Sequence, residues 1–112
     1  MASPQLQNYL VSNRKRLALT QGEVAYLLGV ESDEKVSRHE RFHREPTLAD
    51  ALAYEVIYKR SASELFSGQY QKIEEEVAAR AKALLAKTDG QKLNKRAAYK
   101  RQMIAEIAEI KS

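Results

Sequence analysis

Apolar residues recur at helical spacing along most of the chain, and short polar breaks separate the apolar segments. Leu6, Leu10 and Leu17 predict a first helix over about residues 4–18. Residues 20–23 (Thr-Gln-Gly-Glu) have the form of a capping box, which opens a second helix that Gly29 ends. The pattern therefore predicts two helices joined by a very short turn.

The middle of the chain predicts three further helices. A third helix is expected from Ser32 or Asp33 to about Arg41, with Val36 and Phe42 facing inward.

Thr47 would cap a fourth helix over residues 48–58, after the helix-breaking Pro46. Its inward face is predicted to hold Leu48, Ala51, Leu52 and Val56, flanked by Tyr54 and Tyr58. Residues 61–64 form another capping box for a short fifth helix ending near Phe66, and Gly68 would close this unit.

Residues 69–112 predict two longer helices, each with an apolar stripe. The first stripe contains Tyr70, Ile73, Val77, Leu84 and Leu85. The second contains Leu93, Ala97, Met103, Ile104, Ile107 and Ile110. Neither helix can bury its stripe alone, so the two must pack on the first unit, on each other or on a second chain. The predicted organisation is thus one domain over residues 1–68 and a helical extension over residues 69–112.

Composition narrows the classes of protein. The chain has 112 residues, no cysteine, four Gly and two Pro. The absence of cysteine removes disulfide scaffolds, thiolate zinc sites and cysteine nucleophiles. No apolar run approaches membrane-spanning length. We therefore expect an all-α, cytoplasmic protein with no cofactor and no membrane partner.

The net charge of +4 is unevenly distributed. Residues 1–68 carry nine basic and nine acidic side chains, whereas residues 69–112 carry ten and six. A basic chain of this size favours an acidic partner, most often nucleic acid. The basic run over residues 80–101 is either a solvated helix surface or a patch that faces phosphates or a partner, and both interpretations stay open.

The short turn between the second and third helices is typical of a helix-turn-helix DNA-binding domain. Residues 19–30 (LTQGEVAYLLGV), 36–41 (VSRHER), 46–48 (PTL) and 63–66 (SELF) resemble the Cro/lambda-repressor-type, or xenobiotic-response-element, family of transcriptional regulators. The resemblance covers about residues 6–66 and implies a five-helix lambda-repressor-like domain. The step from Gly29 to Val36 is one residue longer than usual in that family, and Phe42 and Lys59 stand where the family commonly has glycine.

The resemblance assigns DNA-contacting roles by position, with double-stranded DNA as the partner. The candidates for reading base edges are Ser32, Asp33, Glu34, Lys35, Ser37 and Arg38. The candidates for binding phosphates are Thr20, Gln21, Arg41, His43 and Arg44. Lys35 and Arg38 can donate to guanine, whereas Asp33 and Glu34 either accept from cytosine or simply favour the positive end of their own helix. The resemblance also implies a structural ion pair between Arg14 and Glu40.

His39-Glu40-Arg41-Phe42-His43 matches the H-E-x-x-H zinc signature of metalloproteases. Arginines at 38, 41 and 44 oppose a dication there, no strand is predicted to align a peptide, and Arg14 accounts for Glu40. We therefore expect no metal site and no enzyme, with His39 at the surface and His43 in a loop or near a phosphate.

The C-terminal stripes leave two functional interpretations. In the first, the chain is a sequence-specific regulator, acting as a repressor, that binds DNA as a homodimer built at least partly through the stripes. In the second, it is an antitoxin-type autoregulator whose C-terminal helices bind a partner protein. The candidate contact residues for either role are Tyr70, Ile73, Val77, Leu84, Leu85, Met103, Ile104, Ile107 and Ile110.

Overall fold

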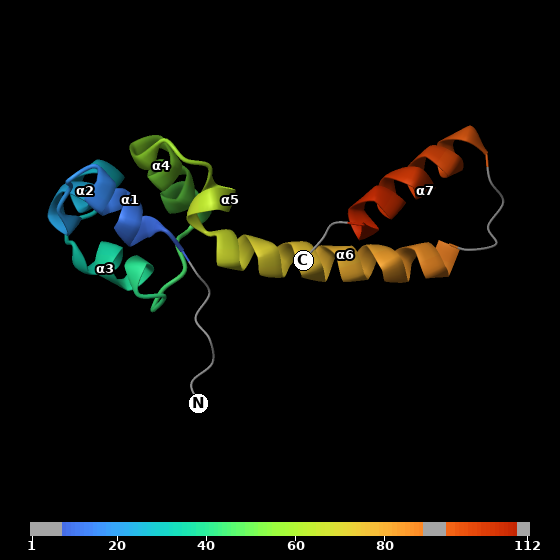
Figure 1. Cartoon of the computed structure of the whole chain (residues 1–112), viewed down its shortest axis with the longest axis horizontal. Helices are drawn as coiled ribbons and strands as arrows, with labels where there is room; N and C mark the ends of the chain where they lie inside the picture. Colours follow the sequence, from blue (N-terminus) through green and yellow to red (C-terminus); the bar gives the residue numbers. More distant parts are fainter. Residues whose placement is uncertain (1–7, 89–93, 110–112) are drawn as a thin grey trace, which may run out of the picture. The chain divides into compact units, whose positions relative to one another are not determined.

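The structure, a computed structural model, describes residues 8–88 and 94–109. Within these residues the chain forms seven helices and no strand, so the all-α prediction is confirmed (Figure 1). The chain divides into two compact units, Met1–Gln69 and Tyr70–Ser112. No described helix combines the length and the apolarity that crossing a membrane requires.

Five helices make up the first unit: α1 (Leu10–Arg16), α2 (Gln21–Leu28), α3 (Glu34–Glu40), α4 (Leu48–Tyr58) and α5 (Ala62–Leu65). Their buried residues form one core, made of Leu10, Val24, Ala25, Val36, Tyr54, Tyr58 and Leu65. Leu19, Leu28, Val30, Ile57 and Phe66 pack against it. Each helix is thus too short to be stable alone and is held by a shared apolar cluster.

Helix α1 is shorter than the predicted residues 4–18. The backbone N–H of Tyr9 donates to the carbonyl of Leu65 over 2.7 Å, outside any helix. Leu17 lies past the C-terminus of α1 and is 38% exposed, so its predicted place on the apolar face was wrong. Ala18 follows with a positive φ of 57°, which turns the chain toward α2. The predicted start, with Leu6, lies outside the described residues.

The bounds of α4 agree with the prediction, but its predicted inward face was wrong. Leu48, Leu52 and Val56 are 76%, 49% and 76% exposed. Tyr54 and Tyr58 are instead completely buried, and their rings stack with centroids 5.8 Å apart. Both sets of residues recur every four positions, and the aromatic set faces inward because it has partners there: Tyr54 also contacts His39 and Phe66 edge-on.

Besides Ala18, two further residues other than glycine adopt the left-handed conformation, each in a turn. Phe42, just past α3, has φ 63°, and Lys59, at the end of α4, has φ 56° and ψ 42°. Phe42 is 36% exposed, so its predicted inward orientation was wrong: the left-handed turn directs it away from the core. Only glycine adopts this conformation without steric cost, so both positions carry local strain.

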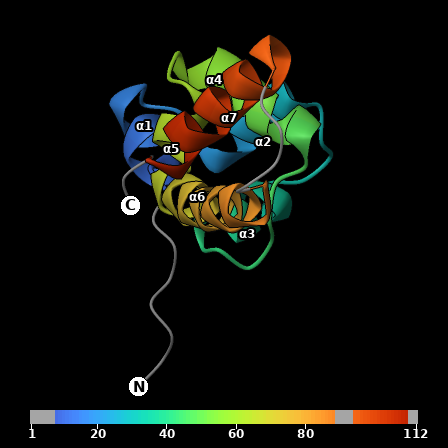
Figure 2. The ribbon, with the colours of Figure 1, turned by 90° about the vertical axis from the view of Figure 1, so that its right-hand side faces the viewer.

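The second unit contains most of α6 (Ser67–Thr88) and all of α7 (Lys95–Ala108), and the two helices pack together (Figures 1 and 2). Gly68 lies in the first turn of α6, one residue before the first unit ends at Gln69. The side chain of Arg101 on α7 donates to the hydroxyl of Thr88 on α6 over 3.0 Å. Among the residues of this unit that the structure describes, Ala78, Ala81 and Ala108 are the most buried, so small side chains lie in the interior there.

Candidate nucleic-acid interface

Helices α2 and α3 are joined by a tight connection with well-defined ends. At the start of α2, the Thr20 hydroxyl accepts from the N–H of Glu23 over 3.0 Å, and the Glu23 carboxylate accepts from the N–H of Thr20 over 2.9 Å. This is the predicted capping box. Gly29 ends α2 in the left-handed conformation, with φ 79°. Helix α3 begins at Glu34, so Ser32 and Asp33 precede it and lie exposed in the connection.

An ion pair fixes the end of α3 to α1. Arg14 donates to both carboxylate oxygens of Glu40, with Nε to Oε2 at 2.7 Å and Nη2 to Oε1 at 3.3 Å. The Glu40 side chain is only 4% exposed, and that of Arg14 is 16% exposed. The hydrogen bond with Glu40 raises the pKa of Arg14 above its ordinary value. The ion pair that the resemblance implies is therefore present. Removal of the Glu40 carboxylate would leave the guanidinium of Arg14 largely buried and without its ionic partner.

Gln21 belongs to the same cluster. Its side-chain amide donates to Oε1 of Glu40 over 2.9 Å, which connects α2 to the ion pair. Arg14 also donates to the carbonyl of Leu19 over 3.1 Å. The Gln21 side chain, a predicted phosphate contact, thus already has an internal partner.

A second polar cluster, unpredicted from the sequence, joins α3 to α4. His39 is 1% exposed, so its predicted surface position was wrong. Its Nδ1 lies 2.8 Å from the hydroxyl of Tyr54, and its Nε2 lies 4.0 Å from Oδ2 of Asp50. Asp50 in turn pairs with the ammonium of Lys35 at 3.1 Å. No short-range pattern points to this cluster, because its members are brought together only when α4 turns its Asp50–Tyr54–Tyr58 side toward α3.

Burial and neighbouring charges shift the pKa values of His39 and Asp50 in opposite directions. Burial lowers the pKa of His39 below its ordinary value, and the neighbouring Asp50 only partly offsets this, so the neutral imidazole is favoured. Burial raises the pKa of Asp50, but Lys35 and the hydroxyl of Thr47 outweigh burial, and the net pKa lies below the usual value. Burial raises the pKa of Tyr54 and raises that of Tyr58 to about 12. Asp50 is therefore the anion of the cluster, and Lys35 is its cation.

The residues of α3 that were predicted to read bases differ in their exposure and in their ion pairs. Glu34 and Arg38 are exposed and form an ion pair one helical turn apart, whereas Ser37 is half-buried. Lys35 is half-buried because it reaches back to Asp50. Of the two cations on α3, Arg38 is therefore the more exposed, with its side chain 47% exposed against 25% for Lys35.

The phosphate candidates past α3 lie in an exposed turn. Arg41, His43 and Arg44 are all exposed, and the N–H of His43 donates to the carbonyl of Arg38 over 2.9 Å. Thr20 is exposed at the start of α2.

The two histidines of the H-E-x-x-H sequence point to different environments. His39 faces the core and bonds to Tyr54, whereas His43 is exposed beyond the end of α3. Glu40 is engaged by Arg14 and Gln21. Across residues 8–88 and 94–109, no three metal-binding side chains gather at one place.

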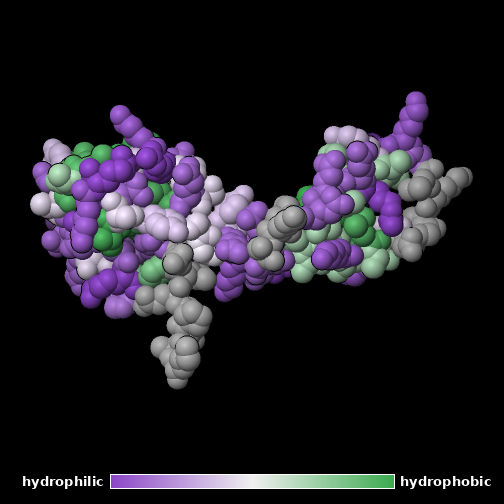
Figure 3. All heavy atoms as spheres, viewed as in Figure 1, coloured by the Kyte–Doolittle hydropathy of each residue, from purple (hydrophilic) through white to green (hydrophobic). Residues whose placement is uncertain are grey.

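The C-terminal candidates are mostly open to solvent. Tyr70, Ile73, Val77, Leu84 and Ile107 are between 38% and 49% exposed, while Leu85, Met103 and Ile104 are half-buried. Ile110 lies outside the described residues. Apolar side chains reach the surface of both units, between hydrophilic ones (Figure 3). The pairing of α6 with α7 therefore leaves part of the α6 stripe without cover.

Comparison with known proteins adds no relative. The chain matches no protein-family model, no curated protein and no solved structure.

Proposed function

We propose that the chain is a sequence-specific DNA-binding regulator that represses transcription and reads the major groove with α3. The observation that carries this proposal is the way α3 is held. Its buried side is attached to α1 and α2 by Glu40 and to α4 by His39, whereas Glu34 and Arg38 are left exposed. A short helix fixed this firmly on one side is suited to presenting the other side to a rigid surface such as a DNA groove.

The charges around α3 are consistent with this role. Four exposed basic or potentially basic side chains, Arg38, Arg41, His43 and Arg44, lie along the second half of α3 and the turn after it. Phosphate contacts position such a domain on DNA, and base contacts select the sequence. In this proposal Arg38 donates to a guanine, and Arg41 and Arg44 bind phosphates.

Selection of bound sites from a randomised duplex pool tests the proposal. An enriched inverted repeat is expected, because a homodimer places two copies of α3 on two half-sites about 34 Å apart. Arg38→Ala should then relax the preference at one base pair of each half-site. Arg44→Ala should weaken binding evenly across sequences and reduce its salt dependence, and Arg60→Ala, at the α4–α5 corner, is the matched control. Absence of sequence enrichment with the intact chain would refute the proposal.

A second function, that of an antitoxin-type autoregulator, is favoured by the open stripe of α6. Tyr70, Ile73 and Val77 are 49%, 47% and 40% exposed although they lie on a helix that already has a neighbour. Such a stripe fits a dimer contact or the binding of a partner protein. Val77→Glu separates this function from DNA reading, because it should abolish partner binding while the base preference of each half-site stays unchanged.

A further inference from the structure

The outer face of α4 is apolar and has no partner among the described residues of the first unit. The residues Leu48, Leu52 and Val56, which we call the outer stripe, recur every four positions on the side opposite the buried Asp50, Tyr54 and Tyr58. Leu48 and Val56 are each 76% exposed. Single exposed apolar residues are ordinary, but three aligned along one helix face indicate a contact surface.

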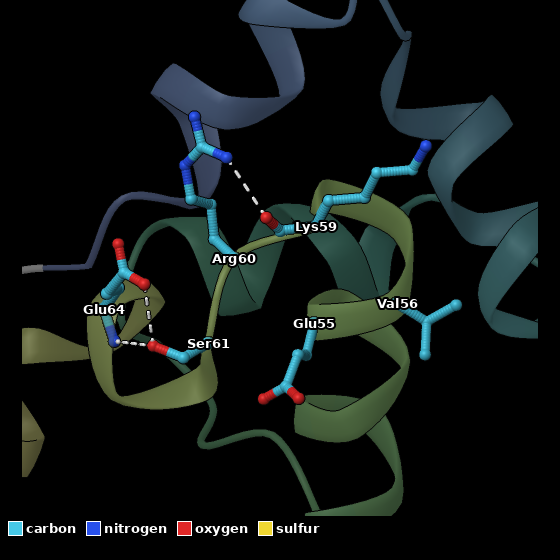
Figure 4. Close-up of a pocket in the computed structure, with 6 residues that line it drawn as sticks. All are labelled: Glu55, Val56, Lys59, Arg60, Ser61 and Glu64. Carbon is cyan, nitrogen blue, oxygen red and sulfur yellow. Dashed lines mark hydrogen bonds between the residues drawn. The ribbon is translucent and has the colours of Figure 1, made fainter.

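Opposite charges stand at the two ends of the outer stripe. Glu45 lies in the non-helical segment that precedes α4, and Lys59 directly follows the helix, three positions after Val56; both are exposed. In Figure 4 the side chains of Val56 and Lys59 extend to the same side of α4, away from Glu55. Arg60, beside Lys59, instead donates to the Lys59 carbonyl over 3.1 Å and belongs to the corner leading to α5.

This arrangement is self-complementary about Leu52. Leu48 and Val56 lie four positions on either side of Leu52 on α4, and Glu45 and Lys59 lie outside the helix, beyond its opposite ends. A second α4 lying antiparallel across the first, with the two-fold axis at Leu52, therefore sets Leu48 against Val56 of the second copy. It also brings the end of α4 that follows Glu45 to the end of the second copy that carries Lys59. Isologous dimers require this kind of pairing, in which residue i meets j and j meets i.

We propose that the outer stripe of α4 is the self-association surface of this chain and that its occupant is a second copy in this antiparallel register. The charges at the ends of the stripe select the antiparallel arrangement, because a parallel one would place Glu45 on Glu45 and Lys59 on Lys59. Two helices of eleven residues make a small contact, so we expect association in about the micromolar range. The open stripe of α6 is then left for another partner.

Sedimentation of the full chain without DNA tests this surface independently of DNA binding. Leu52→Glu would place two carboxylates together at the two-fold axis, and self-association should weaken at least about tenfold. Tyr26→Glu is the matched control, because Tyr26 is an apolar residue on α2 of the same unit and is 83% exposed. It should associate like the wild type. Circular dichroism of each variant would verify that the helices are retained.

Charge reversal tests the register and does not depend on the apolar residues. Lys59→Glu and Glu45→Lys should each weaken self-association a few-fold, because each creates two like-charged pairs per dimer. An equimolar mixture of the two variants should associate as strongly as the wild type, since both end pairs are then opposite in sign. Restoration by mixing would show that residue 45 of one copy lies near residue 59 of the other, as this register requires.

Three results would overturn the proposal. The first is a wild-type chain that stays monomeric at about 100 µM, well above the expected range. The second is a Leu52→Glu chain that associates normally, above all if Val77→Glu on α6 dissociates the dimer instead. The third is a mixture of the two charge variants that associates no better than either alone.

Discussion

Removal of the Glu40 carboxylate should destabilise the first unit strongly. The side chain is 4% exposed and receives three hydrogen bonds, two from Arg14 and one from Gln21. Glu40→Ala leaves a largely buried guanidinium whose remaining described partner is the carbonyl of Leu19. Breaking a buried pair on one side costs about 3–5 kcal/mol, and the 16% exposure of Arg14 places our expectation near about 3 kcal/mol.

This loss is measurable against the total stability of a small domain, which is about 5–15 kcal/mol. Urea unfolding followed by near-ultraviolet circular dichroism suits the experiment, because the stacked, buried rings of Tyr54 and Tyr58 report on the first unit. A loss of about 3 kcal/mol should also lower the melting temperature by roughly 12–24 °C for a unit of this size.

The companion variant Arg14→Met/Glu40→Leu removes both charges together. It should recover much of the loss, since no unpaired buried charge remains. Arg16→Ala, on the same helix as Arg14, is the control. Arg16 donates to the carbonyl of Tyr58 and to the side chain of Asn13, so its removal breaks hydrogen bonds without breaking a buried ion pair. A Glu40→Ala chain within about 1 kcal/mol of the wild type would refute the reasoning.

Three further outcomes are expected. Lys59→Gly should stabilise the chain by about 1 kcal/mol in urea unfolding, because glycine adopts the left-handed conformation freely, and a destabilised variant would contradict the assigned strain. Thr47→Ala should cost about 1 kcal/mol, since its hydroxyl accepts from the N–H of Asp50 at the start of α4; no loss would show that the cap contributes nothing. Because the folded state lowers the pKa of His39, the unfolded chain takes up a proton first, and stability should fall as the pH drops below about 6.5. His39→Gln should remove that loss whereas His43→Gln, at the exposed histidine, should keep it, and equal pH profiles for the two variants would argue against a buried neutral imidazole.

Local patterns were enough to place most helix ends of the first unit. The capping box at Thr20, the side-chain caps at Thr47 and Ser61 and the stop at Gly29 act within one turn of the chain, so neighbouring residues decide them. At Ser61 the hydroxyl accepts from the N–H of Glu64 and donates to its carboxylate, so the reciprocal bond of the predicted capping box is replaced. The Arg14–Glu40 pair was reached only by resemblance, because the two residues lie 26 positions apart and spacing alone does not join them.

The orientation of α4 was beyond such patterns. Two sets of residues with the same four-residue period compete for the core, and hydrophobicity alone favoured Leu48, Leu52 and Val56. Which of the two faces is buried depends on partners from other helices: His39 hydrogen bonds with the hydroxyl of Tyr54, and Lys35 forms an ion pair with Asp50. Amphipathic period is a property of one helix, whereas the face that is buried depends on which side finds complementary volume and charge in its neighbours. That requirement made His39 an internal residue and left an apolar stripe of α4 facing solvent.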